Sequence, residues 1–204
     1  MNEGYIVAAI GTDVGKTIIS AMLVEALEAD YWKPVQAGAL DFTDTDVVGS
    51  LISNTKSVLH PEAFRLTQPM SPHAAARVDH VEIRPEKISL PTTDRFLIVE
   101  LAGGIMVPLS DSFSNLEFIQ QLDLPLIVVA NYYLGSINHT LLTLEVLKKN
   151  NINTKGIIFN GKTNQESKAV IMANTDLPCL ADIPESKEVN KNFILKHAQE
   201  FKHL

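Results

Sequence analysis

The chain has 204 residues, of which 46% are hydrophobic and 20% charged, as is typical of a water-soluble globular protein. Its formal net charge of -7 and its lack of a Lys/Arg cluster argue against a nucleic-acid-binding surface, because neutralising phosphates needs clustered positive charge. The N-terminus does not resemble a secretory signal, the apolar runs are too short for a membrane span, and the single cysteine, Cys179, allows no internal disulfide. We therefore expect a cytoplasmic protein, one domain over residues 1–204, with no nucleic-acid or membrane partner.

Short apolar runs alternate with amphipathic segments along most of the chain. The runs YIVAAI, FLIVEL, PLIVVA and KGIIF are rich in Ile, Val and Leu, which is typical of strands buried on both faces. Segments such as TIISAMLVEALEA have the 3.6-residue period of a helix. The alternation predicts an α/β fold, with a mostly parallel sheet and helices on both faces. Because polar motifs follow several of these strands, we expect one shared site beyond their carboxyl ends.

The first predicted strand is followed by GTDVGKT, which is similar to a phosphate-binding loop. The usual spacing G-x-x-x-x-G-K-[ST] would require a glycine at Ile10, but the chain has it at Gly11, so we interpret the segment as a variant loop. Backbone N–H groups and the start of the next helix would face phosphate oxygens, with Lys16 as the mobile cation and Thr17 as the hydroxyl for Mg²⁺. Gly11 is expected to give the backbone freedom, and Gly15 to permit close approach to phosphate.

The next apolar segment, DYW, leads into KPVQAG, which begins with Lys33. Local sequence alone fits a solvated strand end, but the nearby phosphate loop favours a role in the site. We expect neither Lys33 nor Lys16 to lie in the core. The region 38–95 is less regular, and we predict helices there at about 46–53 and 72–77.

Two carboxylates are candidates for a magnesium site beside the hydroxyl of Thr17. Mg²⁺ prefers oxygen ligands, about six in all. Glu100 ends the strand FLIVEL, and Asp46 begins a helical segment after the polar loop DFTDTD, so both are expected to reach the mouth of the phosphate loop. Each has a structural alternative, because Asp46 also fits a helix N-cap and Glu100 a strand end.

Taken in order, GTDVGKT, YWKPVQAG, VELAGG, VPLSD and LGSINHTLLT make nearly the whole chain resemble the dethiobiotin synthetases, the ATP-dependent ligases of biotin synthesis. The resemblance implies an α/β P-loop homodimer that converts 7,8-diaminopelargonic acid, CO₂ and MgATP into dethiobiotin, ADP and phosphate. It implies a carbamate that attacks the γ-phosphorus and a carbamic-phosphoric anhydride that the second amine closes into a cyclic urea. Lysines and Mg²⁺ would stabilise the negative charge that gathers at each step.

The resemblance also implies roles for individual residues. The expected catalytic residues are Thr12, Lys16 and Lys33. The expected magnesium ligands are Thr17, Asp46 and Glu100. The residues expected to bind the nucleotide and its metal are Asp13, Val14, Gly15, Lys16, Thr17, Ile18, Asp46, Glu100, Ala102, Gly103, Asn160, Pro184 and Glu185. Those expected to bind the substrate are Thr12, Lys33, Ala37, Ser136, Ile137 and Asn138.

The segment LGSINHTLLT predicts a Gly turn and a helix that begins near Ser136, where free N–H groups and the helix dipole favour an anion. In the resembled family that anion is the substrate carboxylate, held by the helix start and the residue that matches Asn138, across the dimer interface. The resemblance places an adenine-reading amide at Asn160.

Three positions depart from the family's pattern. Ala37 stands where a Ser or Thr usually contacts the substrate, Leu101 replaces the glycine of VEGAGG, and Ala9 replaces a glycine before the loop. Loss of one hydroxyl contact would weaken binding by about 1 kcal/mol without removing the chemistry.

Two other functions remain open from the sequence. One is a partner-regulated P-loop ATPase switch, although such proteins usually carry an extra lysine early in the loop, and AIGTDV has none. The other is a related ligase that acts on another amine or amide acceptor. ADP release measured with and without diaminopelargonate would separate the three functions.

Overall fold

The structure is a computed structural model of the chain, and it describes residues 3–204. Its centre is a seven-stranded sheet with the order β4-β2-β6-β1-β7-β8-β9, in which every pair of neighbours is parallel. The strands are β1 (Gly4–Ala9), β2 (Asp30–Trp32), β4 (Leu59–His60), β6 (Leu97–Gly104), β7 (Leu126–Asn131), β8 (Thr154–Gly161) and β9 (Cys179–Pro184). A small second sheet pairs β3 (Val35–Ala37) with β5 (Phe64–Leu66), also in parallel.

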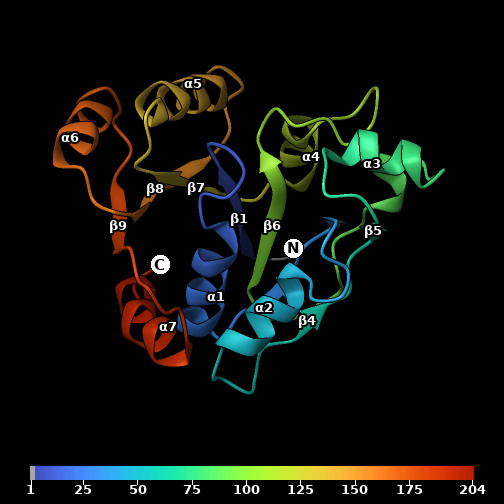
Figure 1. Cartoon of the computed structure of the whole chain (residues 1–204), viewed down its shortest axis with the longest axis horizontal. Coiled ribbons are helices and arrows are strands. Elements are labelled where there is room, and N and C mark those ends of the chain that lie inside the picture. Colours follow the sequence, from blue (N-terminus) through green and yellow to red (C-terminus); the bar gives the residue numbers. More distant parts are fainter. Residues whose placement is uncertain (1–2) are drawn as a thin grey trace.

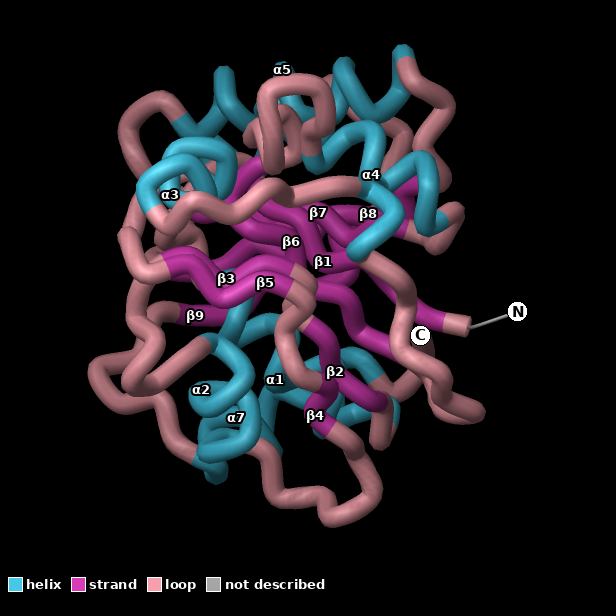
Figure 2. Tube along the Cα trace, turned by 90° about the vertical axis from the view of Figure 1, so that its right-hand side faces the viewer, coloured by secondary structure: helices cyan, strands magenta, loops and turns pink. Residues whose placement is uncertain are grey.

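Helices cover both faces of the large sheet. On one face lie α1 (Lys16–Leu27), α2 (Asp44–Leu51) and α7 (Lys191–Ala198); on the other lie α3 (Pro72–Val78), α4 (Asn115–Leu122) and α5 (Ser136–Lys149) (Figure 2). Helix α6 (Gln165–Ala173) packs beside α5 (Figure 1). Two short 3₁₀ helices, η1 (Pro85–Lys87) and η2 (Gln199–Phe201), complete the described elements. The predicted α/β class with a parallel sheet is confirmed.

The apolar runs form the central strands because both of their faces are covered by helices. All of β1 is buried, and so is β7 except for its last residue. The helix predicted at 46–53 begins earlier, at Asp44, because Thr43 caps it. Within residues 3–204, no helix is long and apolar enough to cross a membrane. A single domain over 1–204 stays a prediction, and its first two residues lie outside the described part of the chain.

The order of the strands places the site. The chain adds β2, β4 and β6 on one side of β1 and then β7, β8 and β9 on the other, so the direction of sheet growth reverses at β1. Loops that leave the carboxyl ends of strands diverge at such a reversal, and this leaves room for a ligand. The phosphate-binding loop leaves β1 at this point.

Candidate active site

The phosphate-binding loop joins β1 to α1, and its end is fixed by a contact with β8. Gly15 precedes α1 with φ 91, in the left-handed region that favours glycine. A Cβ there would lie 2.1 Å from Nδ2 of Asn160, and that amide donates to the carbonyl oxygen of Val14 at 2.9 Å. A side chain at position 15 would therefore collide with the Asn160 amide and disturb its hydrogen bond to the loop.

The backbone freedom expected at Gly11 is not used in this structure. Gly11 has no positive φ, and an added Cβ would meet only the Tyr133 hydroxyl, at an ordinary 3.8 Å. The left-handed positions of the loop are instead Asp13, with φ 57, and Gly15. The glycine displaced in the sequence is thus not a steric requirement of the loop.

A charged cluster stands beside the loop, where β2 and β6 run next to each other. Nζ of Lys33 lies 2.6 Å from Oδ2 of Asp44 and 2.9 Å from Oε1 of Glu100, and so bridges the two carboxylates. Oγ1 of Thr17 lies 3.0 Å from Asp44 Oδ1 and 2.9 Å from Glu100 Oε1. Because a hydroxyl has one proton to donate, Thr17 cannot serve both carboxylates at once. The cluster is rich in oxygen and gathers around a positive charge.

The acidic residue of the second helix that reaches the phosphate loop is Asp44, and not Asp46 as the sequence predicted. Oδ2 of Asp46 accepts from the backbone N–H of Thr43 at 2.8 Å and from its hydroxyl at 2.9 Å, which completes a capping box. Asp44, the first residue of α2, faces Thr17 and Lys33 instead. The spacing Thr43-x-x-Asp46 was the signal in the sequence, because a threonine followed three residues later by an acidic side chain is typical of a helix start.

Both lysines are buried, but they line the cavity and are not part of the hydrophobic core. Lys16 and Lys33 are only 7% and 6% exposed. Burial lowers the pKa of Lys16, whose Nζ donates to the carbonyl oxygen of Gly11 at 3.2 Å. Burial would also lower the pKa of Lys33, but the carboxylates of Glu100 and Asp44 outweigh it and raise the pKa above its ordinary value. Lys33 is therefore a buried ammonium that stays charged.

These groups line a cavity of about 780 Å³ at the carboxyl end of the sheet. It brings together most of the residues predicted around the loop: Thr12, Asp13, Gly15, Lys16, Thr17, Ile18, Lys33, Ala37, Glu100, Ala102 and Gly103. It also contains residues that the sequence did not single out: Val35, Gln36, Ala39, Asp44, Pro69, Met70, Ser71, Pro72 and Val107. Within residues 3–204, no three His, Cys, Asp or Glu side chains gather as a metal site, so a metal there would need the Thr17 hydroxyl as well.

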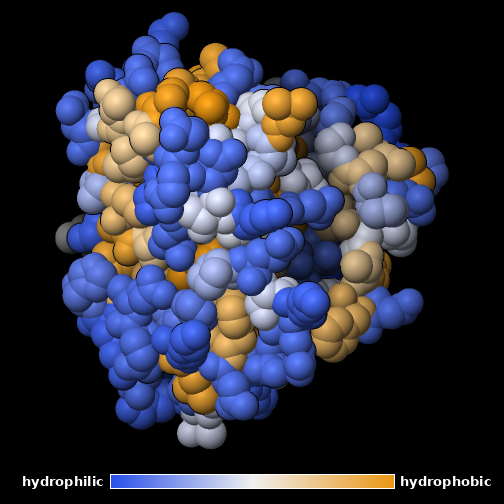
Figure 3. Space-filling model, turned by 60° about the vertical axis from the view of Figure 1, so that its left-hand side comes forward, coloured by the Kyte–Doolittle hydropathy of each residue, from blue (hydrophilic) through white to orange (hydrophobic). Residues whose placement is uncertain are grey.

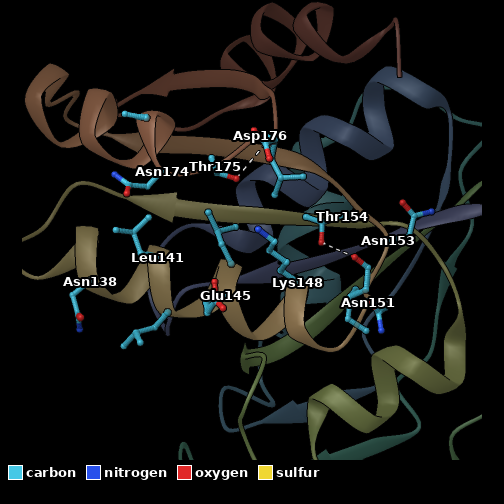
Figure 4. Close-up of a pocket in the computed structure, with 15 residues that line it drawn as sticks. Asn138, Leu141, Glu145, Lys148, Asn151, Asn153, Thr154, Asn174, Thr175 and Asp176 are labelled. Carbon is cyan, nitrogen blue, oxygen red and sulfur yellow. Dashed lines mark hydrogen bonds between the residues drawn. The ribbon is translucent and has the colours of Figure 1, made fainter.

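The predicted carboxylate-binding residues lie at a different place. Ser136 begins α5 and is buried with its Oγ unpartnered, whereas Asn138 is exposed. Figure 4 shows Asn138 at one end of a groove along α5, lined also by Leu141, Glu145 and Lys148. The groove has a volume of about 1050 Å³. Within one chain, Asn138 is therefore not among the residues that line the cavity of the phosphate loop.

The comparisons with known proteins agree with one another along the chain. A family model described as an AAA domain matches residues 3–192. The ATP-dependent dethiobiotin synthetase BioD of Cytophaga hutchinsonii is 48% identical, over 95% of this chain and 94% of that protein. Its counterparts from Christiangramia forsetii and Chlamydia pneumoniae are 42% and 38% identical, each over 99% of this chain and over 97% and 90% of their own lengths. The chain belongs to the dethiobiotin synthetase family.

Solved structures of other proteins are similar to this chain in fold only. The septum site-determining protein MinD of Pyrococcus horikoshii, complexed with Mg-ADP, has a TM-score of 0.62 at 17% identity, over 98% of this chain and 96% of its own. A ParA family ATPase of Chlorobium tepidum has a TM-score of 0.59 at 16% identity, over 100% and 93%. At this identity the likeness supports a P-loop fold and says nothing of the reaction.

Two of the three departures from the family's pattern are core residues. Leu101 and Ala9 are fully buried in β6 and β1, and neither lines the cavity. Leu101 follows Glu100 on a strand, so the two side chains point to opposite faces of the sheet. Ala37 does line the cavity, so the missing hydroxyl is the departure that bears on ligands.

Of the three residues predicted to lie near the adenine base, only Asn160 contacts the phosphate-binding loop. Asn160 contacts the loop through Val14, whereas Pro184 is exposed and Glu185 donates its backbone N–H to the carbonyl oxygen of Gly161 at 3.1 Å. Neither Pro184 nor Glu185 lines the cavity. Adenine contacts by these three residues stay a prediction.

Proposed function

We propose that the chain makes dethiobiotin from 7,8-diaminopelargonic acid and CO₂, with ATP converted to ADP and phosphate. The observation that supports this most strongly is the cavity in which two buried lysines, Lys16 and Lys33, meet Thr17 and two carboxylates beside a phosphate-binding loop. The family's relatives match this chain along nearly its whole length. The predicted cytoplasmic compartment also belongs to the proposal.

The reaction balances without a protein nucleophile. One substrate amine attacks CO₂ and loses a proton, which gives a carbamate. A carbamate oxygen then attacks the γ-phosphorus, and ADP leaves. The second amine attacks the carbamate carbon and loses a proton, phosphate leaves, and a cyclic urea remains. Every step gathers negative charge, so positioning and electrostatics are what the protein needs to supply.

Each group around the cavity has a part in this scheme. The N–H groups at the start of α1 and the ammonium of Lys16 bind the phosphates. The ammonium of Lys33 is proposed to bind the carbamate and the γ-phosphate, and Thr12, which also lines the cavity, contacts the reacting groups. Burial strengthens these interactions because the low local dielectric screens them less than water does.

The oxygens of Thr17, Asp44 and Glu100 fit a divalent cation. The ammonium of Lys33 already lies between the two carboxylates and stands in for such a charge. Hydroxyl and carboxylate oxygens are ligands that Mg²⁺ prefers, and it usually takes few of them from the protein. Bound with ATP, Mg²⁺ would neutralise phosphate charge. Lys33 is then free to leave the carboxylates for the substrate.

We propose that the active form is a homodimer whose partner reaches each cavity through α5. Asn138, the expected ligand of the substrate carboxylate, is exposed on this helix and does not line its own chain's cavity. Leu134, just before α5, is fully exposed and Leu142 on α5 is 57% exposed. On the face in Figure 3, hydrophobic side chains gather in separate patches within a mostly hydrophilic surface. Burial of such leucines favours association.

A complementation experiment tests the shared site. Asn138→Asp should raise the KM of diaminopelargonate far more than that of ATP, because the new carboxylate repels the substrate carboxylate. Mixed with Lys16→Ala, it should regain activity, since one of the two sites in a heterodimer holds an intact Lys16 and an intact Asn138. An inactive mixture with proven subunit exchange would show that the substrate carboxylate is bound within one chain.

ADP release with and without diaminopelargonate tests the reaction itself. The proposal expects release only with the diamine, together with a product that has the mass of dethiobiotin. Steady hydrolysis without the diamine would favour the ATPase switch, and indifference to the diamine would favour a ligase for another acceptor. No feature of the described site favours either alternative.

A further inference from the structure

We propose that Tyr31 is a positioning residue for the cation site, because its hydroxyl fixes one oxygen of Glu100 so that the other oxygen faces Thr17. The inference rests on the proposed function, in which Glu100 is a ligand of the metal. It adds to the site a residue from the strand before Lys33, a position that the predicted site did not include.

The register of the sheet puts the two side chains together. Strand β2 runs parallel to β6, with Tyr31 paired to Ile98. Side chains alternate along a strand, so Glu100, two residues after Ile98, points to the same face as Tyr31. The Tyr31 hydroxyl donates to Oε2 of Glu100 at 3.1 Å. The contact therefore follows from backbone pairing and needs no flexible loop.

The other oxygen of Glu100 contacts two groups that take part in the proposed reaction. Oε1 lies 2.9 Å from the Thr17 hydroxyl and 2.9 Å from Nζ of Lys33. Both of these partners are expected to change when nucleotide and metal bind, because Lys33 moves to the substrate and Thr17 turns to the cation. The contact from Tyr31 lies on the other oxygen, and nothing in the proposed reaction disturbs it.

The hydroxyl is otherwise unfavourable at this position. Tyr31 and Glu100 are both fully buried. A phenylalanine would fill the space with no polar atom to satisfy, whereas a buried phenol needs a partner. A tyrosine phenol carries its proton near neutral pH, so the Tyr31 hydroxyl can donate to Glu100. Its partner is a carboxylate that would otherwise turn about its last bond.

Tyr31→Phe removes the hydroxyl and keeps the ring. Mutation of a residue that hydrogen-bonds to a metal ligand typically lowers the metal affinity by about 10- to 100-fold. We therefore expect the Kd of Mn²⁺, measured by electron paramagnetic resonance on the ADP-saturated protein, to rise by about tenfold or more. The Kd of ADP in EDTA should stay within about twofold, because the nucleotide loop is untouched. Excess Mg²⁺ should restore most of kcat.

A matched control is Tyr5→Phe, which also removes a buried hydroxyl, one that donates to the carbonyl oxygen of Leu204 at 3.0 Å. It should leave the Kd of Mn²⁺ unchanged. In a Glu100→Gln background, the further change Tyr31→Phe should have little effect, because Tyr31 acts through that carboxylate.

Two results would overturn the proposal. One is a Kd of Mn²⁺ for Tyr31→Phe within about twofold of the wild-type value. The other is an equal loss of affinity for Mn²⁺ and for metal-free ADP, which would mean general damage to the loop. Metal binding is measured without turnover, so a wild-type protein that binds Mn²⁺ but makes no dethiobiotin would refute the proposed function separately.

Discussion

Two buried charged clusters lie at opposite ends of the same short strand, and they differ in what surrounds them. At the start of β2, Asp30 is almost fully buried and accepts from the backbone N–H of Val58 at 2.8 Å and from the Thr93 hydroxyl at 2.6 Å. Nε2 of His60 lies 3.1 Å and Nε of Arg95 3.6 Å from the same carboxylate. Asp30 is thus surrounded by donors from β4, from the residue before it and from the loop that leads into β6.

Beyond the other end of β2, Lys33 has the reverse arrangement. Its partners are the carboxylates of Asp44 and Glu100, and one side of the cluster faces the cavity of the phosphate loop. A charged group that is enclosed and fully hydrogen-bonded stabilises the fold. A charged group that lies beside a cavity and contacts only other side chains can instead move to bind a ligand. Burial alone does not separate the two kinds of cluster, but the partners and the cavity do.

The largest expected effects come from the two lysines beside the cavity. Lys33→Met and Lys16→Ala should each lower kcat/KM by about three orders of magnitude or more, because each ammonium faces developing negative charge. Turnover is measured as dethiobiotin formed per folded molecule, with folding checked by circular dichroism. Near-normal turnover in a folded Lys33→Met protein would remove Lys33 from the mechanism.

The next effect separates the two acidic residues of α2. Asp44→Asn should raise the Mg²⁺ concentration needed for half-maximal activity by about tenfold, because a neutral amide is a poorer ligand for a hard cation. Asp46→Asn is the matched control on the same helix, and it should lower the melting temperature slightly and leave the Mg²⁺ titration unchanged, since Asp46 caps the helix. The opposite pattern would restore Asp46 as the ligand.

Asp30→Asn should break the enclosed cluster and leave activity per folded molecule intact. We expect a loss of about 1–3 kcal/mol in the free energy of unfolding, because buried donors lose a charged acceptor. The pKa of Asp30 is lowered: burial would raise it, but the donors from Thr93, Val58 and His60 outweigh burial. Stability from this group is therefore present above its unfolded pKa of about 3.9 and is lost as the pH falls through the folded value.

Denaturant titrations from pH 7 to pH 3 check this sign. The wild-type protein should lose stability toward acid more steeply than Asp30→Asn, with His60 and Arg95 as the other ionisable groups that face the carboxylate. Parallel acid profiles for the two proteins would mean that Asp30 contributes nothing through its charge.

The smallest expected effect lies at the rim of the cavity. Ala37→Ser restores a hydroxyl where the family usually has one, and about 1 kcal/mol of binding corresponds to a KM for diaminopelargonate that is about fivefold lower. The KM of ATP should not change. A KM for the diamine that stays constant would show that Ala37 does not border the substrate.

The sequence predicted the fold and the loop well because both depend on local pattern. Buried runs such as YIVAAI and a GKT before a helix leave few alternatives. It failed where the outcome depended on the contacts of individual side chains. The choice between Asp44 and Asp46 depended on which carboxylate accepts from Thr43, a capping contact that the spacing could have indicated. The burial of Lys33 depended on two carboxylates from α2 and β6, and the role of Tyr31 on strand register. The burial of Lys33 and the role of Tyr31 are not visible in a short segment, whereas the Thr43-x-x-Asp46 spacing is.

The measurement closest to the central claim compares how Mg²⁺ stabilises the wild-type protein and Lys33→Met. The claim is that the Lys33 ammonium and a divalent cation use the same oxygens of Asp44 and Glu100. Without the ammonium these carboxylates lose their buried cation, which destabilises the fold by about 3–5 kcal/mol. Mg²⁺ should therefore raise the melting temperature of Lys33→Met more than that of the wild-type protein, with tighter half-saturation. An equal or smaller rise in the variant would contradict the account.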